Sequence, residues 1–212
     1  MVVQQRQRVS VAEFEALPDD GNRHELVRGE VRVMPPPSKG RHGQIEAAIV
    51  EAIGRYLDDK ARTMGWEPRQ GLDARERLVG FTAVGEFGLR FSLPDDPSQI
   101  RGADGAYVPA AQLASLSWDE DEYFPAVPHL VIEVVSATDR ADDVAEKVQD
   151  YLAGGARRVW YVYPRQRAVY VHDAAGAMRI VRWGEALRDD ELLPDFELPL
   201  DLVFVTPPQT AG

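Results

Sequence analysis

Apolar residues recur at spacings of three and four in two stretches of the chain, and this spacing predicts amphipathic helices. In the first stretch, Ile45, Ile49 and Ile53 share one face of a helix expected over residues 42–57. The second helix is expected to begin after the segment ATDR and to run to about Leu152, before a pair of glycines. A shorter helix, VAEFEAL, is predicted near the N-terminus, where a serine and a following glutamate form a capping box.

Two runs of nearly continuous apolar residues, HLVIEVVS and RRVWYVYP, flank the second long helix. Such runs are typical of strands buried on both faces, so strand, helix and strand together predict a βαβ unit. Shorter alternating patterns predict further strands: HELVRGEVRVM as a hairpin that turns at Arg28 and Gly29, FGLRFSL, DGAYVP, the pair AVYVHD and MRIVRW around residues 174–177, and a last strand in LDLVFV. The segment DDPSQIRG is predicted as a loop, which puts Asp104 at the start of the strand after it.

The predicted elements place the chain in the α/β (α+β) class, as a mixed β-sheet flanked by helices with an N-terminal and a C-terminal β-hairpin as additions. No linker or repeat divides the 212 residues, so a single domain is expected, with a core over about residues 10–205 and a disordered tail at 206–212. Residues 66–80 are rich in charge and glycine, and the pattern assigns no element to them.

The composition narrows the chemistry of any site. The chain has no cysteine and only four histidines, which excludes thiolate sites and disfavours a zinc site built on nitrogen ligands. A metal ion would be bound through oxygen atoms, which favours Mg²⁺ or Mn²⁺. The missing cysteine, the lack of an apolar stretch behind MVVQQRQRVS and the lack of a long apolar run favour a cytoplasmic protein that does not cross a membrane. The net charge of −11 counts against strong, non-specific DNA binding, although a local basic groove is compatible with it.

Glu133 is the most informative polar residue, because it interrupts the apolar strand LVIEVV. An unpaired buried carboxylate costs several kcal/mol, about the whole stability margin of a small domain. A buried ion pair with an arginine would offset this cost, and a solvent-exposed strand face would remove it. A role as a metal ligand or acid–base group would explain why the cost is tolerated. The pattern alone gives the two structural explanations together about as much weight as the functional one.

Asp104 and Lys147 could complete a site with Glu133. Asp104 lies between two glycines, before a short β segment, and an aspartate there is more often a turn residue. Two carboxylates on adjacent strands can, however, converge on one divalent cation. Lys147 borders the apolar stripe of its helix and can reach the sheet, although most helical lysines extend into solvent.

An ordered series of segments resembles the Uma-two endonuclease family, which belongs to the PD-(D/E)XK, or restriction-endonuclease-like, superfamily. The matching segments are HELVRGEV, MPPP with the helix after it, RGADGAYV, HLVIEVVSATDRADDVAEKVQDYLAGGARRVWYVYP, the hairpin that follows, and LPLDLVF. The block from His129 to Pro164 is the most specific part. The resemblance implies a restriction-endonuclease-like fold and a nuclease activity.

The resemblance also implies roles for particular residues. Asp104 and Glu133 would be ligands of Mg²⁺, or of Mn²⁺, and Lys147 would be the catalytic lysine that positions or activates the attacking water. Two positions depart from the superfamily pattern: Ala103 stands where a proline is usual, and Val135 stands where the lysine usually lies. The resemblance implies that in this family the lysine comes from the next helix instead, which fits Lys147.

Three further acidic or basic residues could line the cleft. Glu46 occupies the first long helix, where the superfamily sometimes supplies another metal-site carboxylate, but a solvated helix face is the favoured interpretation. Glu25 and His42 match family positions in the cleft. Glu25 could instead pair structurally with a basic residue, and His42 could simply begin the helix. Tyr151 and Trp160 are expected in the core.

The main functional hypothesis is a Mg²⁺-dependent endonuclease that hydrolyses phosphodiester bonds of DNA, with a homodimer as the expected assembly. The alternative is a catalytically degenerate nuclease fold that binds nucleic acid or protein, which the net charge of −11 and the valine at position 135 favour. A third hypothesis, a metal-dependent hydrolase of a small phosphorylated ligand, agrees better with an acidic surface.

Overall fold

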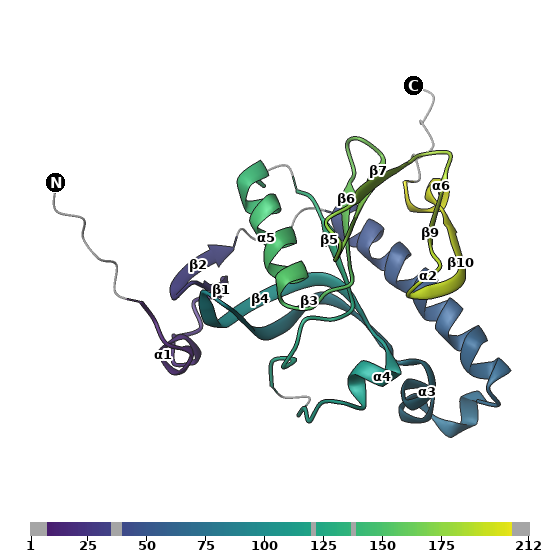
Figure 1. Ribbon diagram of the computed structural model, residues 1–212, viewed down its shortest axis with the longest axis horizontal. Helices are drawn as coiled ribbons and strands as arrows, with labels where there is room; N and C mark the ends of the chain where they lie inside the picture. Colours follow the sequence, from purple (N-terminus) through teal and green to yellow (C-terminus); the bar gives the residue numbers. More distant parts are fainter. Residues whose placement is uncertain (1–7, 35–39, 120–121, 137–138, 205–212) are drawn as a thin grey trace.

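The computed structural model describes residues 8–34, 40–119, 122–136 and 139–204. Its strands form an eight-stranded sheet (Figure 1), in the order β2-β1-β4-β5-β6-β7-β8, with β3 pairing with β4. These strands are β1 (Arg23–Val27), β2 (Glu30–Met34), β3 (Phe81–Leu93), β4 (Asp96–Val108), β5 (Leu130–Val134), β6 (Arg158–Tyr163), β7 (Ala168–Asp173) and β8 (Met178–Arg182). β5 and β6 are parallel, and the other pairs are antiparallel. Two further strands, β9 (Ala186–Asp189) and β10 (Leu193–Pro199), pair in a small separate sheet.

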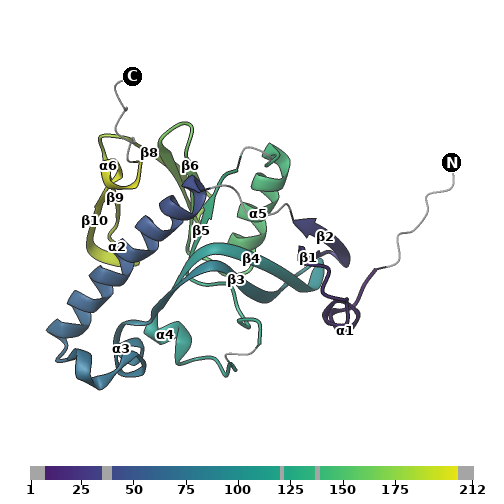
Figure 2. The ribbon, with the colours of Figure 1, turned by 180° about the vertical axis from the view of Figure 1, so that it is seen from behind.

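Two long helices, α2 (Arg41–Thr63) and α5 (Ala141–Ala153), pack against the sheet from different sides, as Figures 1 and 2 show from front and back. The shorter helices are α1 (Val11–Glu15), η1 (Pro68–Gln70), α3 (Leu72–Val79), α4 (Ala110–Leu113) and α6 (Leu200–Val203). None of the helices in the described parts of the chain has the length and apolar character needed to cross a membrane.

The side chains of β5 alternate between two cores. Leu130, Ile132 and Val134 belong to the core that contains α2, and Val131 belongs to the core that contains α5. Glu133 takes the next position on the α5 side. Because both faces of β5 are covered, its other positions are all apolar.

This architecture confirms the predicted fold class, a mixed sheet flanked by helices. The βαβ unit is β5, α5 and β6, with Leu130 paired with Arg158 in a parallel register. The N-terminal hairpin turns at Arg28 and Gly29, which both have positive φ values of 52° and 75°. The capping box of α1 is also present. The predicted disordered tail at residues 206–212 lies outside the described residues.

The loop predicted for DDPSQIRG is wrong, because all but its first residue belong to β4. β4 pairs with β3 along most of its length, for example Ile100 with Arg90. The segment resembles a loop in sequence because it is polar, yet Arg101 is only 1% exposed and its charge is matched by buried carboxylates. Asp104 consequently lies well inside a long strand and not at the start of one.

The structure also differs from prediction near the C-terminus, and it assigns elements to residues 66–80, for which the sequence pattern predicted none. LDLV forms helix α6 and not a strand, and its buried Leu200 and Val203 have helical spacing. Residues 66–80 contain η1 and α3. Arg75 of α3 is buried and lies 2.5 Å from Asp58 of α2, which fixes the short helix against the long one.

Candidate active site

Two acidic side chains lie on neighbouring strands at the centre of the sheet. β4 and β5 run antiparallel with Gly105 opposite Ile132, and continuing this register by one residue puts Asp104 opposite Glu133. The Oδ2 atom of Asp104 accepts a hydrogen bond of 2.7 Å from the N–H of Val134. The sheet therefore brings together the two carboxylates that the sequence singled out.

Glu133 lies under helix α5 and is 6% exposed. Lys147 and Tyr151 are four residues apart on α5 and so lie on one face of it. The Nζ atom of Lys147 is 3.2 Å from each carboxylate oxygen of Glu133, and the Tyr151 hydroxyl donates to Oε1 at 2.7 Å. Of the two structural explanations for a carboxylate in this strand, the exposed face is excluded and the buried ion pair is present, with a lysine in place of the expected arginine.

The surroundings shift the acidity of the two carboxylates in opposite directions. Burial raises the pKa of Glu133 to about 7, and the charge of Asp104 adds to this, although Lys147 acts to lower it. Burial acts on Asp104 as well, but the hydrogen bonds from His42 and Val134 outweigh it, and the pKa of Asp104 lies below its usual value. Asp104 is therefore ionised at neutral pH, whereas Glu133 titrates there.

Helix α2 brings two more polar residues to Asp104. His42 and Glu46 are one turn apart, and the Nε2 atom of His42 is 3.2 Å from Oδ2 of Asp104. This contact raises the pKa of His42. Glu46 is 9% exposed, so the solvated helix face predicted for it is wrong. It shares the buried side of α2 with Val50, four residues further on, and burial raises its pKa.

A β-bulge in β3 holds Glu46 in place. The pairing of β3 with β4 shifts register between Val84 and Phe87, across from Asp104. Gly85 lies in the bulge with a φ of +80°, a conformation that favours glycine. Its N–H donates a hydrogen bond of 2.6 Å to Oε1 of Glu46. The bulge thus supplies a hydrogen-bond donor to a buried carboxylate.

Glu25 of the N-terminal hairpin contacts Lys147 from β1, which lies on the other side of β4 from the strand of Glu133. Its Oε1 atom is 3.3 Å from the Nζ of Lys147, and its Oε2 atom accepts a hydrogen bond of 3.1 Å from Arg101. Glu25 therefore pairs with a basic residue, one of the two alternatives for it, and also contacts the candidate catalytic lysine.

Two residues that contact Glu133 or Glu25, Tyr151 and Arg101, were not predicted as site residues. Tyr151 was expected only as a core residue, and its ring is buried, but its hydroxyl contacts Glu133 and lies 3.1 Å from the carbonyl oxygen of Gly102. Its position four residues after Lys147 was the available signal. Arg101 was assigned to a loop, where burial is not expected. Trp160 is fully buried, as predicted.

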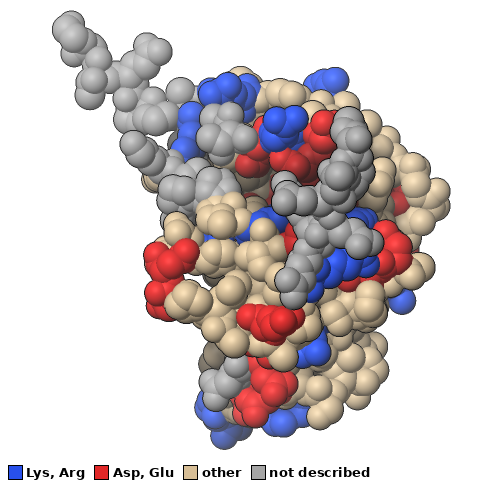
Figure 3. All heavy atoms as spheres, turned by 90° about the vertical axis from the view of Figure 1, so that its left-hand side faces the viewer, with Lys and Arg blue, Asp and Glu red and all other residues tan. Residues whose placement is uncertain are grey.

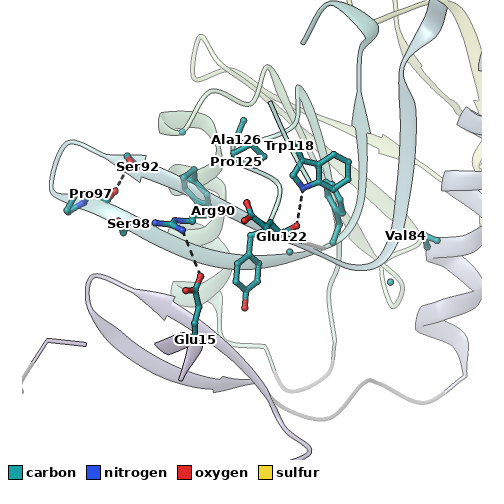
Figure 4. Close-up of a pocket in the computed structure, with 16 residues that line it drawn as sticks. Glu15, Val84, Arg90, Ser92, Pro97, Ser98, Trp118, Glu122, Pro125 and Ala126 are labelled. Carbon is teal, nitrogen blue, oxygen red and sulfur yellow. Dashed lines mark hydrogen bonds and ion pairs between the residues drawn. The ribbon is translucent and has the colours of Figure 1, made fainter. Parts of the chain in front are cut away.

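A large pocket of about 1270 Å³ lies next to the candidate site (Figure 4), but Asp104, Glu133 and Lys147 do not line it. Val84 and Gly85 of the bulge are among its lining residues, and the pocket extends along β3. Among the described residues that line it, the charged ones are Glu15, Arg90 and Glu122, so this part of its wall carries more acidic than basic groups. The pocket does not have the basic character expected of a groove for the DNA backbone.

The oxygen atoms of the candidate site are of the type that hard divalent cations bind. Asp104 and Glu133 offer carboxylate oxygens, which Mg²⁺ and Mn²⁺ prefer. Repulsion between these groups contributes to the raised pKa of Glu133, and a cation would relieve it. Within the described residues, no three His, Asp or Glu side chains already converge as a complete set of ligands. Mg²⁺ commonly uses one or two carboxylates and keeps several waters, so such a set is not required.

Comparison with known proteins identifies the family and a similar fold. The family model Uma2, described as "Putative restriction endonuclease", matches residues 11–201. The fold is similar to a crystal structure described as a "putative nuclease belonging to DUF820" from Anabaena variabilis ATCC 29413, with a TM-score of 0.69 and 16% sequence identity over 92% of this chain and 97% of that chain. Among curated proteins there is no significant match. Since the family model covers nearly the whole of the described chain, the protein belongs to the Uma2 family.

Proposed function

We propose that the protein is a Mg²⁺- or Mn²⁺-dependent endonuclease that hydrolyses phosphodiester bonds of DNA. The observation that carries this proposal is the contact of the Lys147 ammonium with both oxygens of Glu133, at 3.2 Å, next to a strand that carries Asp104. Two carboxylates and an ammonium in a largely buried position suit a reaction in which negative charge develops on phosphoryl oxygens. The family description supports the nuclease assignment.

Asp104 and Glu133 are the residues that would hold the cation. When bound, the cation would supply a water of lowered pKa and would neutralise charge on a phosphoryl oxygen. Asp104 is prepared for this role because His42 and the N–H of Val134 fix its Oδ2 atom and keep it ionised.

Lys147 would orient the attacking water or the phosphate through its charge. Its side chain is 15% exposed, and in such a setting a fixed cation interacts with a phosphoryl oxygen more strongly than it would in water. Burial acts to lower the pKa of Lys147, but the carboxylates of Glu133 and Glu25 outweigh it and raise this pKa, so Lys147 remains protonated at neutral pH. Lys147 therefore stabilises charge and does not act as a base.

Nicking of supercoiled plasmid DNA tests the proposal. Wild-type protein is expected to nick with Mg²⁺ or Mn²⁺ and to stop with a chelator. Glu133→Gln and Lys147→Met are each expected to lower the rate by about a hundredfold or more, the loss typical of a group that stabilises transition-state charge. Lys60→Met is the matched control, because Lys60 lies on α2 and pairs only with Asp195 and Tyr56 among its described contacts. Equal rates in all four proteins would assign any nicking to a contaminant.

A binding function without catalysis is the second candidate. On the face shown in Figure 3, acidic and basic side chains of the described residues intermingle, and the net charge of the chain is −11. Such a surface suits a protein partner better than a long stretch of DNA. Uptake of Mn²⁺ at Asp104 would favour the nuclease, since a binding module does not require it.

A further inference from the structure

The N-terminal hairpin of β1 and β2 forms ion pairs with helix α5, at residues before and after Lys147. Arg28 and Arg32 both contact Glu146, at 2.6 Å and 2.5 Å. Arg28 also lies 2.9 Å from Asp150, which is on the next turn of α5. Helix α5 is thus held by the hairpin one residue before Lys147 and three residues after it.

Arg101 of β4 links the hairpin to helix α5 in the protein interior. It is 1% exposed, and its guanidinium pairs with Glu25 of the hairpin and with Asp150 of α5. Its Nε donates to Gln99 at 3.0 Å. A planar guanidinium with three acceptors in fixed directions restricts the rotation of each partner, which a lysine at this position would not do.

Glu25 is held by three donors. Its Oε2 atom accepts from Arg101, and its Oε1 atom accepts from the N–H of Gly102 at 3.2 Å and lies 3.3 Å from the Nζ of Lys147. The Glu25 side chain is 5% exposed. The ammonium of Lys147 consequently lies between two buried carboxylates, Glu25 and Glu133, and also within 3.4 Å of the Gly102 carbonyl oxygen.

A lysine side chain is long and flexible, and one ion pair fixes it poorly. Glu133 alone leaves the ammonium free to swing around the carboxylate. A second carboxylate, carried by the strand on the other side of β4 and itself fixed by Arg101 and the backbone N–H of Gly102, restricts that motion. The geometry points to Glu25 as the positioning residue of Lys147, carried by a hairpin that is part of the active site. This inference rests on the proposed nuclease function for its effect on rate, but the position of the ammonium can be measured without it.

The chain has only three lysines, Lys39, Lys60 and Lys147, which makes a direct measurement practicable. Protein labelled with ¹⁵N and ¹³C at lysine gives three ammonium signals in an NMR spectrum, and Lys147→Met identifies one of them. In the wild type the Lys147 signal is expected to be displaced from that of Lys60 and to exchange its protons slowly with water. In Glu25→Gln it is expected to move toward the Lys60 signal and to exchange about tenfold faster or more, because one of its two carboxylate partners is gone.

Asp195→Asn is the matched control, because it makes the same chemical change beside the other described lysine. Asp195 lies 3.0 Å from Lys60, so only the Lys60 signal should move. If Glu25→Gln does not fold, Glu25→Asp keeps the negative charge and withdraws the carboxylate by about 1.5 Å. The same displacement of the Lys147 signal is expected there. An unchanged Lys147 signal in a folded Glu25 variant would overturn the inference.

The rate of DNA cleavage gives a second readout. Glu25→Gln is expected to lower kcat by about tenfold to a hundredfold with little change in KM, since a displaced group loses its orientation and not its substrate. A change in KM alone would contradict positioning. If the wild type cleaves no DNA, the proposed function fails, and the NMR signals still decide whether Glu25 positions Lys147.

Discussion

Glu133 combines burial, an ammonium partner and a hydroxyl donor in one side chain. The sequence places its charge within an apolar strand, and the structure buries it there. Glu46 shows the limit of the same reasoning. It was assigned to solvent although Val50, one turn further along the helix, is apolar, and its buried donor is a backbone N–H from a bulge that no helix pattern can predict.

The stability of the metal-free protein is expected to depend on pH through Glu133. Its pKa is about 7 in the folded protein against an ordinary value of 4.5, so the folded state binds this proton more tightly than the unfolded state does. The resulting stabilisation is complete below about pH 4.5 and is lost as the pH rises to about 7. At about 1.4 kcal/mol per pKa unit, the loss amounts to about 3 kcal/mol.

Urea denaturation of the wild type and of Glu133→Gln at several pH values measures this change. The wild type should lose stability relative to the variant as the pH rises through this range, because the amide does not titrate. A constant difference between the two proteins from pH 4.5 to 7.5 would show that Glu133 has no raised pKa.

Tyr151→Phe is expected to weaken metal binding and cleavage by about tenfold, with a loss of about 1 kcal/mol in stability for the deleted hydrogen bond. The ring would still fill its place between α5 and the sheet, but Glu133 would lose the hydroxyl that donates to Oε1 at 2.7 Å. Tyr107→Phe is the control, because Tyr107 is also buried and its hydroxyl donates to Val79 at 3.0 Å. Calorimetry with Mn²⁺ should separate the two variants. A similar Mn²⁺ affinity in both would mean that Tyr151 is only a core residue.

At the scale of elements, the sequence predicted the βαβ unit and the hairpins well because their apolar periodicities are strong. It failed at β4, where buried charges replace apolar residues. Arg101 and Gln99 are both almost inaccessible to solvent. Gln99 accepts a hydrogen bond from Arg101, and the charged partners of Arg101 come from β1 and α5, far away in the chain. The polarity of neighbouring residues alone does not predict ion-pair partners that only the tertiary fold brings close.

The bulge in β3 gives a prediction at this scale. Gly85→Ala is expected to cost about 1–2 kcal/mol, because an alanine at a φ of +80° is strained. The displaced N–H would release Glu46, so cleavage should also fall. Gly176→Ala is the control, since Gly176 has a φ of +83° in the turn between β7 and β8 and neither glycine has atoms near an added Cβ.

Chemical denaturation and nicking assays on both glycine variants distinguish strain from function. Both variants should lose similar stability, and only Gly85→Ala should lose activity. Equal losses of activity would mean that the bulge has no specific role at the site.

For the molecule as a whole, the net charge of −11 means that the proposed DNA substrate would have to approach an acidic protein. A divalent cation at the carboxylates would reduce this repulsion locally. Binding of labelled DNA to Lys147→Met, followed by fluorescence anisotropy, is therefore expected to strengthen about tenfold or more when Mg²⁺ replaces Na⁺ at equal ionic strength. No difference between the two salts would favour a module that binds a partner other than DNA.

The single domain, the homodimer and the cytoplasmic location remain predictions from the sequence and the resemblance.

The central claim is that Asp104 and Glu133 form a cation site. Titration of Mn²⁺ into the wild type and into Asp104→Asn, followed by calorimetry, tests it most directly. One ion per chain is expected for the wild type, with binding lost in Asp104→Asn, because the ionised carboxylate fixed by His42 and Val134 would be gone. Equal binding by both proteins, or no binding by the wild type, would contradict the account.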